Sequence, residues 1–236
     1  GMVNAIGLQN PGIDLFCKRD IPFLKKYDTK IIVNVCGHAP EEYLAVVERL
    51  ADEPIDMMEI NISCPNVNAG FLAFGQDAKH VEELTAQIKK IAKQPIIMKL
   101  TPNVTDITEI AKAAEAGGAD ALSLINTLTG MKIDINRRTF AVANKTGGVS
   151  GPVVHPIAVR MVYQTAQAVN IPIIGMGGIA TPEDAIEMIL AGASAVSVGT
   201  ANFYNPNATI EIIDGIEAYM KKNGFESVKD MVGIVK

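Results

Sequence analysis

The residues with the clearest potential for chemistry lie between positions 57 and 75, where the sequence reads MMEINISCPNVNAGFLAFG. An apolar run predicts a buried strand, and the thiol of Cys64 follows it between two amides, Asn61 and Asn66. A cysteine has a reference pKa of about 8.5 and accepts a proton once it is ionised. The loop behind it is mostly small and apolar and could close over a ligand. The stretch therefore indicates proton abstraction by Cys64; a small buried cysteine with a structural role is the alternative.

A glycine-rich turn further along the chain indicates a phosphate site. Residues 175–185 read GMGGIATPEDA and place glycines after an apolar strand and before a helix that begins near Thr181. The next strand is followed by a similar turn at Gly199 and Thr200, in SVGTANF. In a barrel of parallel strands, the turns after the last two strands bind phosphate through backbone N–H groups. Tight turns without a ligand are the alternative explanation of these glycines.

The elements that must position these residues alternate along the whole chain. Six aliphatic runs predict strands at residues 31–35, 57–62, 95–100, 119–125, 171–175 and 194–198. Six amphipathic stretches predict helices near residues 40–52, 77–93, 106–116, 156–169, 182–191 and 208–222. This order predicts parallel strands joined by right-handed crossovers and covered by helices on both faces. Polar residues follow each strand, which favours a (β/α)8 TIM barrel; a doubly wound sheet is the structural alternative.

Composition and charge limit the kind of protein this is. With 236 residues, 48% of them hydrophobic and 20% charged, we predict a single domain over residues 1–236. The net charge of −5 argues against a nucleic-acid surface. Three cysteines with no metal-type spacing leave an odd number, which favours a reducing, cytoplasmic setting and no metal site. No apolar run approaches the roughly 18 residues that a membrane span needs.

Three segments together resemble one enzyme family. NISCPN around Cys64, NAIGLQNPG at residues 4–12 and GGVSGP at residues 147–152 are similar to motifs of class 1 dihydroorotate dehydrogenase, most closely of its NAD-linked, two-subunit branch. The resemblance extends over essentially the whole chain. It implies FMN-dependent oxidation of dihydroorotate to orotate in pyrimidine biosynthesis, with Cys64 as the catalytic base. It also implies electron transfer to a partner subunit that carries FAD and an iron–sulfur cluster, in a heterotetramer built on a homodimer.

The resemblance also accounts for the number of strands. Six are predicted here, whereas a closed barrel has eight, and family members have roughly another 65 residues before the NAIGLQNPG motif that hold the first two. Those strands also contribute to the flavin site, so a chain that begins at Gly1 is expected to bind flavin poorly. Its first and last strands would be unpaired edges. We therefore expect an open barrel without its first two strands, or a neighbouring chain in the gap.

The resemblance assigns site residues by position. Uncharged amides, which both donate and accept hydrogen bonds, suit a planar ring with carbonyl and N–H groups. Contacts to the substrate are implied for Asn4, Ala5, Ile6, Gly7, Leu8, Asn61, Asn66, Asn126 and Thr127. Contacts to FMN are implied for Asn34, Asn61, Lys99, Ile125, Gly151, Gly177, Gly178, Gly199 and Thr200. The positive charge of Lys99 could stabilise a reduced, anionic flavin; a surface lysine is the alternative.

Two rival functions stay open. The flavin domain of dihydropyrimidine dehydrogenase also resembles KLTPNVTDI and the cysteine loop. The other rival, from a different class, is a non-catalytic barrel fragment that binds only a partner or a phosphate ligand. An assay with orotate against uracil, and a flavin spectrum of the purified chain, separate these possibilities.

The remaining polar features carry less functional information. The three histidines, His38, His80 and His155, lie in unrelated contexts and indicate no triad or metal cluster. Residues 131–145 alternate like a hairpin, which we expect to act as scaffold or cover on the active-site face. Arg137 and Arg138 at its tip are expected to form an ordinary turn.

Overall fold

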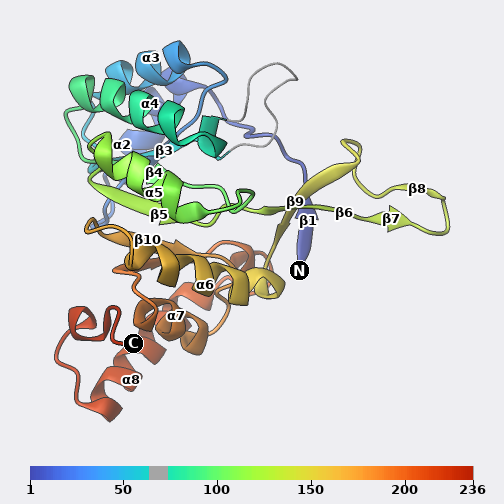
Figure 1. Ribbon diagram of the computed structural model, residues 1–236, viewed down its shortest axis with the longest axis vertical. Helices are drawn as coiled ribbons and strands as arrows, with labels where there is room; N and C mark the ends of the chain where they lie inside the picture. Colours follow the sequence, from blue (N-terminus) through green and yellow to red (C-terminus); the bar gives the residue numbers. More distant parts are fainter. Residues whose placement is uncertain (64–73, 236) are drawn as a thin grey trace. The chain divides into compact units, whose positions relative to one another are not determined.

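The chain is divided into two compact units. A computed structural model describes residues 1–63 and 74–235 (Figure 1). The first unit consists of Gly1–Ala5, Thr101–Thr108 and Ser123–Lys236, and the second of Ile6–Leu100 and Glu109–Leu122. The single domain expected over residues 1–236 stays a prediction.

Six strands form one sheet in the order β11-β10-β5-β4-β3-β2. In the second unit, β2 (Ile32–Val35), β3 (Met57–Asn61) and β4 (Ile96–Lys99) pair in parallel. In the first unit, β10 (Ile173–Met176) pairs in parallel with β11 (Ala195–Ser197). The remaining strand, β5 (Ala121–Leu124), contributes residues to both units. Each strand overlaps one of the predicted aliphatic runs, so the six predicted strands are confirmed.

The two edges of this sheet are β2 and β11. Within residues 1–63 and 74–235, no strand pairs with the outer side of either, so the sheet is open, as the strand count predicted. Burial alternates along β2, where Ile32 is 46% exposed, and β11 exposes both Ala195 and Ser197. The prediction that all strands are covered on both faces is therefore wrong for these two, because one face of each is open to solvent.

Six helices follow the strands at the predicted positions. They are α3 (Pro40–Leu50), α4 (Ala78–Ile91), α5 (Ile107–Ala116), α6 (His155–Ala166), α7 (Pro182–Leu190) and α8 (Ala208–Asn223). Capping side chains fix several of their ends: the carboxylate of Asp77 accepts the backbone N–H of His80 at the start of α4. Gly224 ends α8 in a left-handed conformation, with a φ of 75°.

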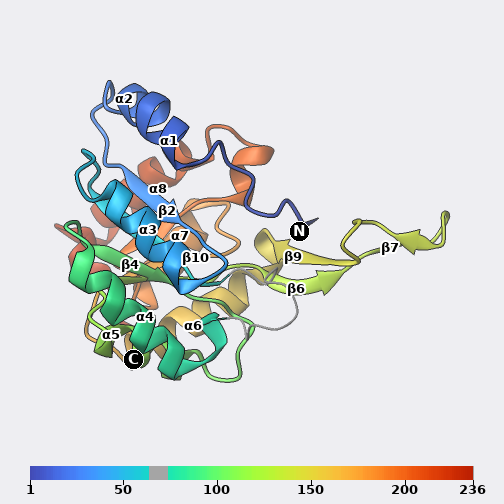
Figure 2. The ribbon, with the colours of Figure 1, turned by 90° about the horizontal axis from the view of Figure 1, so that it is seen from above.

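A short helical segment near the N-terminus was not predicted. It comprises α1 (Ile13–Leu15), a π-helical turn (Phe16–Asp20) and α2 (Ile21–Leu24), and Figure 2 shows it as one continuous coil. Among its residues only Cys17 and Ile21 are buried, which is too few for a helical period to emerge from the sequence.

Each unit has its own apolar interior. In the second unit, Ile97 and Met98 of β4 are fully buried, as in the middle strand of a covered parallel sheet, and Val47 of α3 and Ile88 of α4 are fully buried too. In the first unit, the buried residues Ile186 and Ile189 of α7 pack with Met231. Side chains of α8 are partly buried against this cluster, which fixes α7 between its neighbours.

A β-ribbon made of residues 128–150 extends from the first unit (Figure 1). Its base is a three-stranded antiparallel sheet of β1 (Met2–Asn4), β9 (Thr146–Ser150) and β6 (Leu128–Met131), with β9 in the middle. Its tip is the hairpin of β7 (Ile133–Asp134) and β8 (Thr139–Phe140). The predicted hairpin is therefore confirmed, while its role as scaffold or cover stays a prediction.

Candidate functional site

The glycine turn after β10 is held against the first turn of α6. Gly177 and Gly178 have φ angles of 130° and 74°. A β-carbon on Gly177 would lie 2.7 Å from the Cβ of Ala158. A β-carbon on Gly178 would lie 2.7 Å from the Cβ of His155 and 2.8 Å from the carbonyl oxygen of Gly151. Only glycine fits this backbone conformation and this close approach.

Three other predicted FMN contacts, Gly151, Gly199 and Thr200, belong to the same unit. Gly151, with a φ of 90°, approaches Thr200 so that a β-carbon on residue 151 would lie 3.4 Å from Cγ2 of Thr200. The hydroxyl of Thr200 donates to Oγ of Ser150 at 2.8 Å. A β-carbon on Gly199 would meet no atom within 4 Å among the described residues, so the structure is open at this point. We call Gly151, Gly177, Gly178, Gly199 and Thr200 the phosphate cradle.

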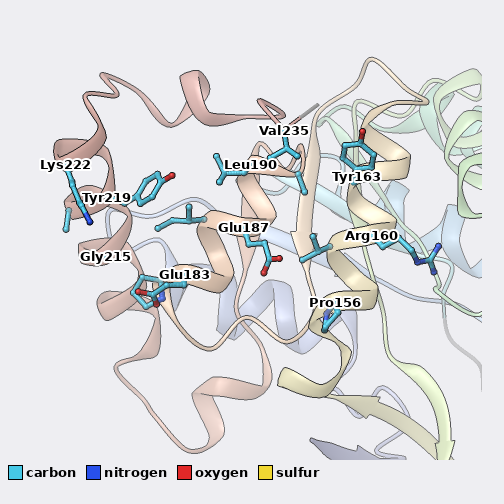
Figure 3. A pocket seen from close by; sticks show the side chains of 15 residues that line it. Pro156, Arg160, Tyr163, Glu183, Glu187, Leu190, Gly215, Tyr219, Lys222 and Val235 are labelled. Carbon is cyan, nitrogen blue, oxygen red and sulfur yellow. The ribbon is translucent and has the colours of Figure 1, made fainter.

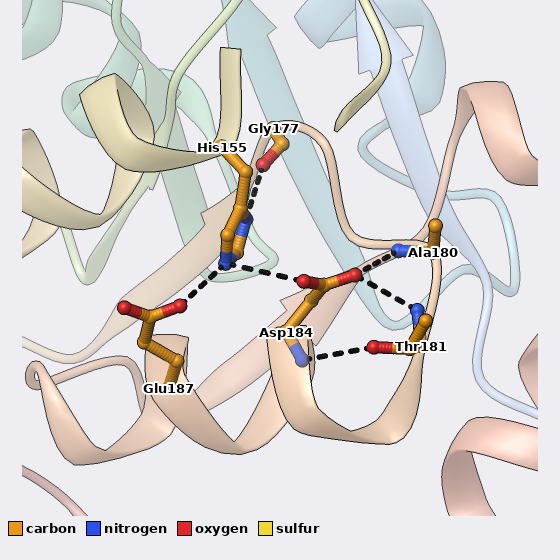
Figure 4. Close-up of polar contacts among 6 residues, drawn as sticks. All are labelled: His155, Gly177, Ala180, Thr181, Asp184 and Glu187. Carbon is orange, nitrogen blue, oxygen red and sulfur yellow. Dashed lines mark hydrogen bonds and ion pairs between the residues drawn. The ribbon is translucent and has the colours of Figure 1, made fainter. Parts of the chain in front are cut away.

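Side chains from two helices fix the glycine turn (Figure 4). The ring of His155, on α6, is buried; its Nδ1 lies 2.9 Å from the carbonyl oxygen of Gly177. Its Nε2 lies 3.1 Å from Oε2 of Glu187 and 3.8 Å from Oδ1 of Asp184, both on α7. The other oxygen of Asp184 accepts the backbone N–H groups of Ala180 and Thr181, each at 2.9 Å. The Gly177 end of the turn is therefore linked to α7 through His155, and the Ala180–Thr181 end directly through Asp184.

His155 was not predicted to take part in the site. His155 is isolated in the sequence from the residues that it contacts, which lie about one helix and one strand further along the chain. The available signal was the spacing of Asp184 and Glu187. Residues three apart share one face of a helix, so both carboxylates can face one partner, which in the structure is His155.

Predicted substrate contacts of the first unit gather at the base of the β-ribbon. Asn4 on β1 is the register partner of Gly148 on β9, and a β-carbon on Gly148 would collide with the side chain of Thr127. The amide oxygen of Asn126 accepts the backbone N–H of Thr127 at 2.8 Å. Asn4, Asn126 and Thr127 are therefore neighbours, as expected of residues that share a site.

Asn103 belongs to this group, although sequence reasoning did not select it. Its Nδ2 donates to the carbonyl oxygen of Thr127 at 3.0 Å and to Oγ1 of Thr101 at 3.1 Å, and its Oδ1 accepts the backbone N–H of Thr129 at 3.0 Å. It thus links the loop after β4 to the start of the β-ribbon. The signal in the sequence was its position in KLTPN, just after a predicted strand, where polar residues of a site are expected.

The backbone of Ile125 lies under the glycine turn. Its N–H donates to the carbonyl oxygen of Met176 at 2.9 Å, and a β-carbon on Gly177 would lie 3.2 Å from Cγ1 of Ile125. The predicted flavin contact at Ile125 therefore lies next to the phosphate cradle.

The second unit brings its own predicted contacts together at the carboxyl ends of β2, β3 and β4. The register pairs Asn34 with Glu59 and Asn61 with Lys99, which places all four side chains on one face of the sheet. The amide of Asn34 donates to Oε2 of Glu59 at 2.5 Å, and Oδ1 of Asn61 accepts the hydroxyl of Ser63 at 2.5 Å. Glu59 was not predicted; its spacing two residues before Asn61 was the signal.

Burial distinguishes the members of this polar row. Asn61 is 3% exposed, whereas Lys99 is half-buried. Ile96, Ile97, Met98 and Leu100 are fully buried, so the predicted burial of the strand around Lys99 is confirmed.

The NAIGL segment is divided between the units. Asn4 and Ala5 belong to the first, and Ile6, Gly7 and Leu8 to the second. Leu8 has a positive φ of 58° and lines a cavity of about 470 Å³ together with Asn34 and Cys36, whereas the side chain of Ile6 is 72% exposed. The predicted base, Cys64, and the predicted contact Asn66 lie outside the described residues.

A wider groove of about 910 Å³ lies in the first unit (Figure 3). Its lining comes from α6, α7 and α8, with Tyr163, Leu190 and Tyr219 among the side chains. None of the predicted site residues lines it. The groove is therefore separate from the predicted contacts of the unit to which it belongs.

Two kinds of feature were searched for in the described part of the chain. No helix there is both long and apolar enough to cross a membrane. No group of three histidine, cysteine or carboxylate side chains there is arranged to hold a metal ion.

Comparison with known proteins places this chain in a family. The sequence pattern of the dihydroorotate dehydrogenase family matches residues 1–220. A protein of Lachnoclostridium phytofermentans named dihydroorotate dehydrogenase B (NAD(+)), catalytic subunit, is 67% identical over 236 residues, which are 100% of this chain and 79% of that protein. A protein of the same name from Alkaliphilus metalliredigens is 60% identical over 233 residues, covering 99% of this chain and 77% of its own length.

A solved structure supports the fold. The crystal structure of an Eimeria tenella DHODH in complex with ferulenol superimposes with a TM-score of 0.80 and 23% identity, covering 98% of this chain and 70% of the other. The predicted TIM barrel is thereby confirmed in an incomplete form with six strands. Because the sequence pattern covers residues 1–220 and the relatives are so similar, the chain belongs to the dihydroorotate dehydrogenase family.

Proposed function

We propose that this chain oxidises dihydroorotate to orotate in pyrimidine biosynthesis, as the FMN-binding catalytic subunit of an NAD-linked enzyme. The observation that carries the proposal is the 67% identity, along the whole chain, to a relative that is named for this reaction and this role. Family membership alone covers the oxidation of dihydroorotate; the cofactor, the base and the electron acceptor are the finer parts of the proposal.

The phosphate cradle supports FMN as the cofactor. The positive φ angles of Gly151, Gly177 and Gly178 turn the backbone without side chains, and the methyl group of Thr200 lies beside Gly151. Backbone N–H groups are neutral donors that suit the phosphate ester of FMN, so the residues present fit the group. In this proposal the phosphate cradle holds the phosphate of FMN, and Ile125 borders the flavin ring. Bound FMN supplies the acceptor for the hydride that leaves carbon 6 of dihydroorotate.

The polar side chains then bind and deprotonate the substrate. Asn4, Asn61, Asn66, Asn126 and Thr127, with the backbone of residues 4–8, would hydrogen-bond the carbonyl and N–H groups of the ring. Lys99, with Asn34 and Asn61 on the same sheet face, would place a positive charge and amide dipoles toward the flavin. Cys64, as thiolate, takes the proton from carbon 5 of dihydroorotate.

The name of the relatives also supports a separate partner subunit. A cluster held by four thiolates needs four cysteines, and this chain has three. We therefore assign FAD and the iron–sulfur cluster to the partner, and a homodimer of this chain to the centre of a cytoplasmic heterotetramer.

The test is anaerobic reduction of the purified protein, prepared with any residues that precede Gly1 in its gene, because the chain from Gly1 alone is expected to bind flavin poorly. Dihydroorotate is expected to bleach the visible flavin band, while dihydrouracil leaves it unchanged, and NADH bleaches it only after the partner subunit is added. Bleaching by dihydrouracil in place of dihydroorotate would favour the dihydropyrimidine dehydrogenase alternative. A purified protein without a flavin spectrum that also fails to take up added FMN would favour the non-catalytic alternative.

A further inference from the structure

The ring of His155 is surrounded by hydrogen-bond acceptors (Figure 4). Nδ1 faces the carbonyl oxygen of Gly177 at 2.9 Å. Nε2 faces Oε2 of Glu187 at 3.1 Å and Oδ1 of Asp184 at 3.8 Å. The imidazole is only 8% exposed, so water has little access to replace these partners.

These partners determine where a proton of the ring lies. A carbonyl oxygen only accepts hydrogen bonds, so Nδ1 must donate to Gly177. Nε2 faces the carboxylates of Glu187 and Asp184, which hold the ring in this orientation. The contacts therefore place a proton on Nδ1, directed at the carbonyl oxygen of Gly177.

The carbonyl that His155 binds belongs to the peptide group between Gly177 and Gly178. In a trans peptide the C=O and the following N–H point in opposite directions. Because His155 holds the Gly177 oxygen toward α6, the N–H of Gly178 points away from the ring. Because glycine allows many backbone conformations, the two successive glycines, with φ angles of 130° and 74°, do not by themselves fix the orientation of this peptide.

Asp184 restrains the other end of the same turn. Its Oδ2 accepts the N–H groups of Ala180 and Thr181, while its Oδ1 lies toward His155. Asp184 and Glu187 are the charged groups of α7 that face the ring, and α6 contributes His155 itself. Within this set of three side chains, His155 is the one that reaches the glycine pair directly.

We propose that His155 is a positioning residue that, through a hydrogen bond from Nδ1, fixes the Gly177–Gly178 peptide for binding an anionic phosphate ester. The ligand side of this inference rests on the proposed function, because the phosphate cradle is there assigned to FMN. The hydrogen bond from Nδ1 follows from the contacts of His155 itself and does not depend on that assignment.

The first test is nuclear magnetic resonance of the ¹⁵N-labelled protein at neutral pH. The chain has three histidines, so loss of one signal set in His155→Gln assigns the ring of residue 155. Its Nδ1 is expected to carry a proton and to show the chemical shift of a ring nitrogen that donates a hydrogen bond. A ring in which Nδ1 carries no proton would overturn the inference.

The second test compares FMN with riboflavin, which lacks the phosphate. In His155→Leu, the dissociation constant of FMN is expected to rise about ten- to a hundredfold, as for a lost hydrogen bond to a charged group. The constant for riboflavin is expected to change less than about twofold on the same grounds, since it lacks the group that the turn positions. His155→Lys, which keeps a hydrogen-bond donor, is expected to recover part of the FMN affinity.

The controls separate this role from a general loss of structure. His80→Leu alters a half-exposed histidine on α4 of the other unit and should leave both constants unchanged. Equal weakening of FMN and riboflavin in His155→Leu would overturn a phosphate-specific role. If the unaltered protein binds neither flavin, the proposed function and the ligand side of this inference both fail, while the resonance experiment still decides whether Nδ1 of His155 carries the proton that faces Gly177.

Discussion

The backbone of Gly178 passes so close to His155 that a β-carbon at position 178 would lie 2.7 Å from the Cβ of His155. Real β-carbons essentially never come so near, and the neighbour on the other side is the rigid carbonyl of Gly151 at 2.8 Å. The shape of the phosphate cradle therefore depends on the absence of a single methyl group.

Gly178→Ala is expected to abolish FMN binding and to lower the free energy of unfolding. Gly224→Ala is the matched control, because Gly224 has nearly the same φ of 75° but an added methyl group there would meet no atom within 4 Å among the described residues. The control should lose about 1 kcal/mol from backbone strain. Gly178→Ala should lose about 1–3 kcal/mol more, because the methyl group also overpacks. Equal losses in urea unfolding would contradict the close approach.

Asn103→Ala is expected to weaken orotate binding through the displacement of Thr127. The change removes three hydrogen bonds, to Thr101, Thr127 and Thr129, and takes the side-chain donor away from the partly buried carbonyl oxygen of Thr127. The free energy of unfolding should fall by about 1–3 kcal/mol. Orotate affinity is measured by the change in the flavin spectrum. Asn223→Ala, at the exposed end of α8, serves as the control, and an unchanged orotate affinity in Asn103→Ala would remove Asn103 from the site.

Cys64→Ala tests the base. It should leave FMN bound and slow the reduction of the flavin by dihydroorotate by about two to four orders of magnitude, the usual effect of a positioned general base. Stopped-flow absorbance under anaerobic conditions measures this step. Reduction at the rate of the unaltered protein would exclude Cys64 from proton transfer.

Cys17 is expected to resist alkylation in the folded protein. Burial raises the pKa of its thiol, and the nearby carboxylate of Glu53 raises it further, so little thiolate is present at neutral pH. Cys36 is only half-buried and should react with iodoacetamide before Cys17 does. Mass spectrometry of peptides after timed labelling, with a urea-unfolded sample as the control, gives the order. Faster labelling of Cys17 than of Cys36 would contradict the prediction.

Asp56 should stabilise the second unit in a pH-dependent manner. The backbone N–H of Ile31 and the ammonium of Lys30 lower the pKa of its carboxyl below the ordinary value. A carboxyl with a lowered pKa in the folded state contributes stability above its unfolded pKa and loses it as the pH falls through the folded value. Asp56→Ala should therefore lower the urea midpoint at neutral pH. The difference from the unaltered protein should shrink under acidic conditions; a constant difference at all pH values would contradict the linkage.

Local signals in the sequence were sufficient for the strands, the main helices and the glycine turn. The apolar run around Ile97 and the glycines at 177 and 178 each carry their structural consequence within a few residues. The hydrogen bonds of Asn103 and His155 could not be predicted, because their partners become neighbours only when the chain folds. The solvent-open face of β2 at Ile32 likewise depends on which elements cover the sheet. The roles assigned to Cys64 and Asn66 stay predictions.

Asp184 combines two roles in the turn. With Thr181 it forms the capping box of α7, and with the N–H groups of Ala180 and Thr181 it closes the glycine turn. Fraying of the first turn of α7 therefore also releases the segment that would grip the phosphate. Under the proposed function, the rate at which the cofactor dissociates is set by a local unfolding event, and FMN slows hydrogen exchange at the amides of residues 180 and 181 while distant helices exchange as before.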